Sequence, residues 1–184
     1  MNPRYYYITI LSILITLTSC TKEVDFNQID DVNVHAVYTS TLIYADFTAD
    51  KFLDNNNNEI TYSTDLIDAP IDKTTIKYLE KVEFTLIISN SFNRQFNFNF
   101  NFFDDAGQLI YTLQPTVVVA PNSEATTYIL EIPTDDISVI ENTRFFGFLV
   151  KLEPSSDGST LDGTETANLN LKSSVKLFYN YRKI

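Results

Sequence analysis

The sequence is poor in the residues from which crosslinks and metal or catalytic sites are most often built. Its 184 residues include one cysteine, one histidine and no tryptophan. This composition excludes a disulfide scaffold and any site that needs two histidines or two thiols. Basic residues are scarce too, since 13 Lys and Arg stand against 24 Asp and Glu, a formal net charge of −11. Because phosphate backbones repel such a chain, we expect no nucleic-acid partner.

An apolar run lies close to the N-terminus, where Ile8 to Leu17 follows Arg4. It is too short to cross about 30 Å of hydrocarbon as a permanent helix and is typical of a signal peptide. The run ends at Leu17-Thr18-Ser19-Cys20, which resembles a bacterial lipobox. The resemblance implies cleavage directly before Cys20 and a diacylglycerol on its sulfur. Residues 1–19 would then be the signal peptide.

Residues 20–31 are expected to form the lipidated cysteine and a tether. Thr21 is not the aspartate that retains many such lipoproteins in the inner membrane, so the resemblance implies the outer membrane. Lys22 and Glu23 also resemble the export tag with which Bacteroidota place lipoproteins on the cell surface, although Val24 interrupts the acidic run that the tag prefers. The leaflet, cell surface or periplasmic, stays open. The lipid on Cys20 is the covalent group expected, with no further cofactor.

Residues 32–184 are expected to form a single all-β domain. Segments rich in Val, Ile, Phe, Tyr and Thr are separated by turn residues at roughly the 8–12-residue spacing of sandwiches and barrels. The clearest segment is Arg94–Phe102, in which phenylalanine alternates strictly with asparagine from residue 96 onward, and it predicts a strand with one buried and one solvated face. Residues 82–88 keep the same period. The short connection 90–93 predicts that these two strands are antiparallel neighbours.

Turn residues and prolines predict several further features. The expected elements are a hairpin at Asp104–Gly107, an edge or sheet-switching strand at Thr116–Ala120 after Pro115, a short helix at about Asp135–Glu141 capped by Thr134, a bulge at Gly147, a loop at Asp157–Glu165 and a last strand at Asn168–Arg182. Together they predict a two-sheet antiparallel β-sandwich of seven to nine strands with at most one short helix. Residues 78–132 resemble immunoglobulin-like domains of bacterial surface proteins. With the lipobox, the chain is similar to small uncharacterised lipoproteins of Bacteroidota.

Candidate binding and catalytic residues are few. A hydrolase would have to use His35, but no nucleophile motif accompanies it. Asp54, Asn56, Asn58 and Asp65 partly match a calcium-binding loop, yet Glu59 stands where its sharp turn requires glycine. An asparagine-rich loop tip explains the same residues, so we expect no metal at this loop.

The row of asparagines at 97, 99 and 101 could bind a partner or glycan, or it could be the wet face of a sheet. The sequence therefore predicts no enzyme. It predicts a lipid-anchored binding or accessory module of the outer membrane, with the membrane as its partner. The alternative is an accessory subunit of an outer-membrane complex for export, assembly or uptake.

Overall fold

The computed structural model describes residues 33–69, 71 and 73–182, of which 34–181 form one compact unit. The described residues contain eight strands, one short α-helix and two 3-10 helices. In chain order these are β1 (Asn33–Thr48), η2 (Ala49–Phe52), β2 (Tyr62–Asp68), α2 (Lys73–Ile76), β3 (Leu79–Asn90), β4 (Phe96–Phe103), β5 (Leu109–Val119), β6 (Ser123–Ile132), η3 (Thr134–Asn142), β7 (Phe145–Leu152) and β8 (Asn168–Arg182).

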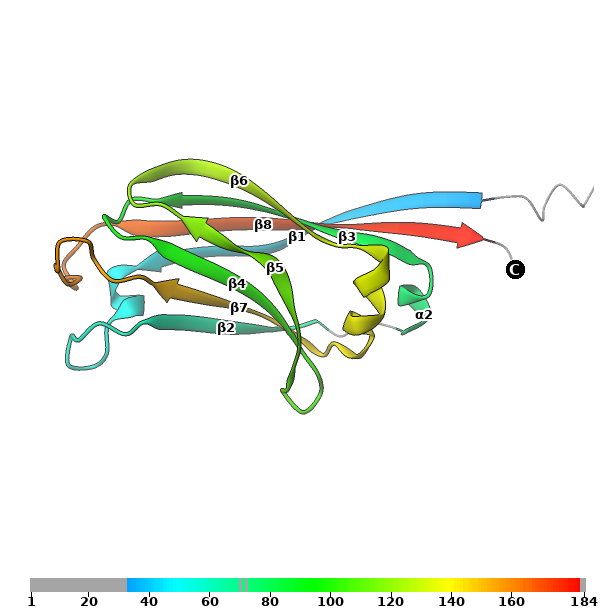
Figure 1. Ribbon diagram of the computed structural model, residues 1–184, viewed down its shortest axis with the longest axis horizontal. Coiled ribbons are helices and arrows are strands. Elements are labelled where there is room, and N and C mark those ends of the chain that lie inside the picture. The colour runs from blue at the N-terminus through cyan, green and yellow to red at the C-terminus, as the bar shows by residue number, and fades with distance from the viewer. Residues whose placement is uncertain (1–32, 70, 72, 183–184) are drawn as a thin grey trace, which may run out of the picture. The chain divides into compact units, whose positions relative to one another are not determined.

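The strands form two four-stranded sheets that pack face to face (Figure 1). Sheet A has the order β1-β8-β3-β6, and sheet B has the order β2-β7-β4-β5. Strands pair in a nested series, with β4 beside β5, β3 beside β6, β2 beside β7 and β1 beside β8. Only the β4–β5 connection stays within a sheet. This is the arrangement of an eight-stranded jelly roll, and it confirms the predicted two-sheet antiparallel sandwich with one short helix.

Two predictions about strand order need correction. Immunoglobulin sandwiches keep their first two strands in one sheet, whereas β1 and β2 lie in different sheets here. The predicted pairing of 82–88 with 96–102 is also wrong, because β3 pairs with β6 and β8. The reason lies in Asn90, whose side-chain amide donates to the carbonyls of Arg94 and Ala120 and whose oxygen accepts from the Phe92 N–H. These bonds hold the β3–β4 connection in a conformation in which the chain crosses from sheet A to sheet B.

The inward face of β4 carries the centre of the core. Phe96, Phe98, Phe100 and Phe102 are at most 3% exposed, as their alternation predicts. Phe98 stacks on Phe100, and Phe100 and Phe102 pack against Phe146 of β7, with 5.9 Å between the ring centroids of Phe100 and Phe146. Across the sandwich, Phe98 packs against Phe47 of β1 and Phe102 packs against Phe84 of β3. Burial of a phenylalanine side chain contributes about 1.5–3 kcal/mol, so this row holds sheet B against sheet A.

The β4–β5 hairpin and its edge strand are also confirmed. Gly107 has a φ of +73° and donates its N–H to the Asp104 carbonyl, which closes the turn. The strand β5, which contains Pro115 and residues 116–119, lies at the edge of sheet B. The last strand has its predicted bounds.

Two local predictions differ from the structure. The helix near residue 135 is the 3-10 helix η3, and Thr134 is its first residue rather than its cap. The Thr134 hydroxyl donates instead to the Glu80 carbonyl at 2.7 Å.

Gly147 is not a bulge, because the pairing of β7 with β2 and with β4 runs through it without a register shift. A Cβ at this position would lie 2.6 Å from Leu66 Cδ2 and 3.1 Å from the Asp65 carbonyl. The glycine therefore allows close packing over the outer face of sheet B.

We expect Gly147→Ala to lower the free energy of unfolding by about 1–3 kcal/mol, the usual cost of overpacking. Adding Leu66→Ala should recover part of that loss, because the Leu66 side chain is the nearest obstacle and is 57% exposed. Urea denaturation of both single variants and the double variant measures the effect. Strictly additive losses would contradict the close-packing explanation.

Candidate functional site

An apolar cavity of about 390 Å³ lies between the two sheets, at the end of the sandwich that carries α2 and η3. Sheet A forms one wall with Leu42 of β1, Val82 of β3 and Leu177 of β8. Phe102 of β4 and Phe146 of β7 form the opposite wall. The volume falls within the range of about 300–1,000 Å³ that is usual for small-molecule sites.

The strand lengths explain why the cavity exists. Strands β1 and β8 continue beyond the strands of sheet B, so part of the inner face of sheet A has no strand opposite (Figure 1). Ile76 of α2 and Ile140 of η3 cover that part and line the cavity. Some lining residues are only half-buried, so the cavity is open to solvent; they are Leu42, Ala69, Ile71, Val175 and Leu177.

Tyrosines line the inner face of sheet A where it extends past the cavity. Tyr179 lines the cavity and is 5% exposed, and its ring lies 5.5 Å from Tyr38 and 5.6 Å from Tyr181 between centroids. Tyr181 in turn packs against Tyr78 at 5.1 Å. Burial, followed by the nearby Tyr181 and Tyr38 phenols, raises the pKa of Tyr179. The cavity is thus continuous with an aromatic surface, of which Tyr38 is 57% exposed.

One polar group in the cavity lining has no partner within the described residues. Thr143 is 5% exposed, and its Oγ1 makes no hydrogen bond. Its backbone is fixed on both sides, because its N–H donates to the Ile140 carbonyl and its carbonyl accepts from the Ile71 N–H. Buried hydroxyls are rarely left without a partner, and each exception needs an explanation. This oxygen has less than 1 Å² of accessible surface, so it faces neither solvent nor the open space of the cavity.

The four candidate calcium ligands do not come together as one binding site. Asp54 Oδ1 accepts hydrogen bonds from the N–H groups of Asn56 and Asn58 at 2.7 and 2.8 Å. Hydrogen bonds from Asn58 and then Asn56 lower the pKa of Asp54. Asn57 has a φ of +61°, typical of an asparagine loop tip. Asp65 lies in the strand β2, where its carboxylate accepts from the N–H of Leu66. Over the described ranges, no group of three or more His, Cys, Asp or Glu could hold a metal ion.

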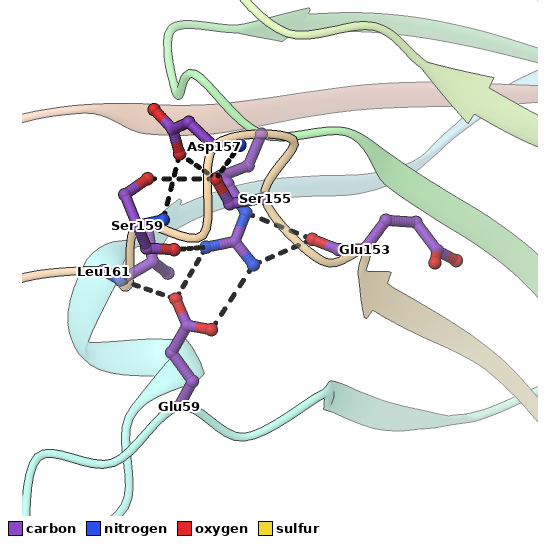
Figure 2. Close-up of polar contacts among 7 residues, drawn as sticks. Glu59, Glu153, Ser155, Asp157, Ser159 and Leu161 are labelled. Atoms are coloured by element: carbon purple, nitrogen blue, oxygen red, sulfur yellow. Dashed lines mark hydrogen bonds and ion pairs between the residues drawn. The ribbon is translucent and has the colours of Figure 1, made fainter.

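The loop between β7 and β8, which contains the predicted loop 157–165, is held by a buried ion pair. Arg94, in the β3–β4 connection, is 5% exposed and donates from Nη1 and Nη2 to Glu59 Oε1 and Oε2, at 2.7 and 3.3 Å. It also donates to the carbonyls of Glu153 and Ser159, so all five guanidinium N–H groups have acceptors. Figure 2 shows Glu59, Glu153 and Ser159, which come from two loops, around the guanidinium of Arg94. We call this group of contacts the Arg94 centre.

Two carboxylates near this centre have lowered pKa values. Burial of Glu59 acts to raise the pKa, but hydrogen bonds from Arg94 and from the Leu161 N–H outweigh burial and lower it. Hydrogen bonds from Ser155 and then Ser159 lower the pKa of Asp157 (Figure 2). These contacts tie three connections together, and sequence analysis did not single out Arg94. The one sequence feature that could have pointed to Arg94 is its position, a basic residue in a short connection between two strongly apolar strands.

The asparagine row of β4 lies on the outer face of sheet B and is half-buried. Asn99 Oδ1 and Asn101 Oδ1 accept hydrogen bonds from the hydroxyls of Thr116 and Thr112 on β5. Asn97 donates to Glu153 at 2.6 Å. The row therefore forms cross-strand bonds within the protein.

The other predicted site residues lie away from the cavity or outside the described residues. His35 is exposed on β1 and does not line the cavity. Cys20 and the residues 17–19 before it lie outside the described residues, so their assignment stays a prediction. Within the part of the chain that the structure describes, no helix has the length and apolar character needed to cross a membrane.

Comparisons with known proteins find similarity among solved structures. No family model matches it, and no curated protein matches it. Among solved structures, it is similar to a "putative secreted protein" from Parabacteroides distasonis, with 14% identity and a TM-score of 0.49 over 63% of this chain and 37% of that chain. It is also similar to the subviral particle of infectious bursal disease virus, with 15% identity and a TM-score of 0.41 over 79% of this chain and 32% of that one. The chain thus spans only about a third of each.

We expect Arg94→Met to lower the free energy of unfolding by about 3–5 kcal/mol, because it leaves the Glu59 carboxylate partly buried without its counterion. Arg144→Met is the matched control. Arg144 is 38% exposed and pairs at the surface with Asp68 at 2.8 Å, a kind of pair that contributes about 0–1 kcal/mol. Chemical denaturation compares the two variants, and equal losses would show that the Arg94 centre is no stronger than a surface pair.

Proposed function

We propose that this protein is a lipid-anchored, non-enzymatic binding module of the bacterial outer membrane. The single observation that carries the binding role is the apolar cavity between the sheets. Aliphatic and aromatic side chains form its lining, and Tyr179 is the one titratable residue among the described residues that line it. Such a lining suits an apolar ligand.

The lipobox Leu17-Thr18-Ser19-Cys20 supports the anchor. Strand β1 begins at Asn33, so a tether of only about a dozen residues would separate the lipid from the sandwich. The N-terminal end of β1 and the C-terminal end of β8 point the same way, past α2 and η3 (Figure 1). The tether would therefore leave the sandwich at the end that contains the cavity. An anchored protein of this design holds its binding site close to the membrane.

The alternative of an accessory subunit is favoured by one surface. On β2, an edge strand of sheet B, Tyr62 and Leu66 are 51% and 57% exposed. Exposed apolar residues on an edge strand are a common contact for a protein partner. Crosslinking to a protein through β2, rather than through the cavity end, would favour this second function.

We expect Cys20→Ser to abolish lipid attachment and cleavage before residue 20, because the thiol is the acceptor in the lipoprotein pathway that the lipobox resembles. Mass spectrometry of the protein isolated from cells measures both changes. Detergent-phase partitioning measures the loss of the anchor. Thr18→Ser, which keeps a small residue at its position, is the control and should be processed normally. Normal acylation of the Cys20→Ser protein would refute the anchor.

A photocrosslinking residue in place of Tyr38 should capture a bound molecule in cells, because the Tyr38 ring contacts Tyr179 in the cavity lining. The same residue in place of Tyr44 is the matched control. Tyr44 lies on the same strand and is 67% exposed but does not line the cavity. We expect an adduct from position 38 that is absent from position 44, as measured by mass spectrometry. Identical adducts from both positions would argue against binding at the cavity end.

A further inference from the structure

Sheet A ends in a two-stranded arm at the end of the sandwich that carries α2 and η3. We define the arm as residues 34–38 of β1 and 178–181 of β8, which are neighbouring strands. Figure 1 shows these two strand ends continuing past α2, with no described strand of sheet B opposite them. Because no second sheet covers the arm, its side chains contact one another, solvent or a surface outside the sandwich.

The β1 strand of the arm exposes apolar side chains on both faces. Val34, Val37 and Tyr38 all have about half or more of their surface exposed. Successive side chains of a strand point to opposite faces, so Val37 and Tyr38 lie on opposite faces of the arm. A docked protein surface covers one face of such a ribbon, whereas lipid head groups can surround both. The distribution of exposed apolar residues therefore favours a lipid surface.

Tyrosines form the inner face of the arm. Tyr38, Tyr179 and Tyr181 pack in a row, and Tyr78 joins this row just before β3 begins. A tyrosine side chain has an apolar ring and a polar hydroxyl, and tyrosine is enriched where membrane hydrocarbon meets water. The arm thus has the residue composition of a membrane-interface segment.

The strands of the arm carry no acidic side chain, although the whole chain has a formal net charge of −11. No Asp or Glu occurs at positions 33–45 or 166–184. Acids do occur before the arm, at Asp30 and Asp31 of the tether. Beside the arm, the Lys77 ammonium lies 5.3 Å from the centroid of the Tyr78 ring. These two strands can therefore approach anionic lipid without the repulsion that the acidic parts of the protein would meet.

The expected anchor is within reach of the arm. Twelve residues separate Cys20 from Asn33, the first residue of β1. A segment of that length spans at most about 40 Å when fully extended and roughly 20 Å as a flexible coil. Such a short link would present the arm to the membrane at an effective concentration on the order of millimolar, so that even a weak contact would form.

We propose that the arm is a membrane contact, in which Val34, Val37 and Tyr38 insert among the lipid head groups of the bilayer that holds the Cys20 anchor. This inference rests on the proposed function, because the lipid on Cys20 brings the arm to the bilayer. The contact fixes the orientation of the sandwich, with the cavity end toward the membrane and the Arg94 centre away from it.

A single introduced tryptophan tests the contact, because the chain has none of its own. Tyr38→Trp and the matched control Tyr44→Trp are purified from cells as lipidated proteins and reconstituted into vesicles of phosphatidylethanolamine and phosphatidylglycerol. Tyr44 is exposed on the same strand, about 20 Å further along it. Bromine atoms on the lipid acyl chains quench a tryptophan that lies close to them. We expect quenching at position 38 to be at least about threefold stronger than at position 44, with emission shifted to shorter wavelength.

A charged variant of the Tyr38→Trp protein tests the apolar contact itself. Val37→Glu places a carboxylate at the inserted end of the arm, where burial is costly, so it should remove most of the quenching. Lipid attachment should stay unchanged. Val118→Glu is the matched control, because Val118 is similarly exposed but lies on β5 of sheet B. It should leave the quenching as it was, and circular dichroism should show the same fold for both variants.

Equal quenching at positions 38 and 44, or no quenching at position 38, would overturn the proposal. Quenching that survives Val37→Glu would overturn it too, because insertion would then not depend on the apolar end of the arm. Crosslinking of position 38 to a protein in cells, without quenching in vesicles, would assign the arm to a protein partner instead.

Failure of the arm proposal and failure of the anchor are separable. A protein that carries lipid on Cys20 but shows no quenching leaves the proposed function standing. Absence of lipid on Cys20 in cells would refute the anchor. The purified chain can then be coupled through Cys20, its only thiol, to a maleimide phospholipid. The same quenching measurement on that conjugate still decides whether the arm contacts the bilayer.

Discussion

The sandwich depends on the burial of one row of aromatic rings. The inward side chains of β4 fill the space between the sheets, and the rings of β7 and β3 pack against them, with Phe84 and Phe146 stacked at 5.6 Å. No disulfide is available to a chain with one cysteine, so apolar burial carries the stability of this fold. The polar contacts around Arg94 act at the other end of the sandwich, where they fix loops that also bury Phe92 and Leu161.

The cavity follows from the same packing. The phenylalanine rings of β4 and β7 fill the space between the sheets, whereas the short helical segments α2 and η3 cover the part of sheet A that extends beyond sheet B (Figure 1). The cavity lies at the end nearest the predicted anchor, and the hydrogen bonds around Arg94 lie at the opposite end. The proposed binding site and the Arg94 contacts are thus separated along the length of the strands.

Much of the fold follows from local sequence patterns, and the strand order does not. Alternation with a period of two gives the buried face of β4, and Gly107 gives the β4–β5 hairpin, because both depend on nearby residues. The crossing of the chain after β3 depends on bonds from Asn90 to Arg94 and Ala120, and the second of these spans 30 positions. Nothing near Asn90 distinguishes that crossing from an ordinary hairpin.

The candidate site was equally hard to anticipate. Thr143 lies between Asn142 and Arg144 in an ordinary polar stretch, and only the packing of η3 under sheet A makes its hydroxyl buried and unpartnered. Conversely, the residues that attracted attention as metal ligands proved to bond their own loop through Asp54. A cavity arises from differences in strand length across the sandwich, which no single segment encodes.

The nested pairing has a consequence for the export that the lipobox predicts. Strand β1 needs β8 as its neighbour, so sheet A cannot close until the last strand of the sandwich is available. The β4–β5 hairpin can form early, but each further pair joins segments that are more distant in sequence, and such pairing is slow. A chain that crosses a membrane in extended form would therefore stay compatible with its translocation channel until passage is almost complete.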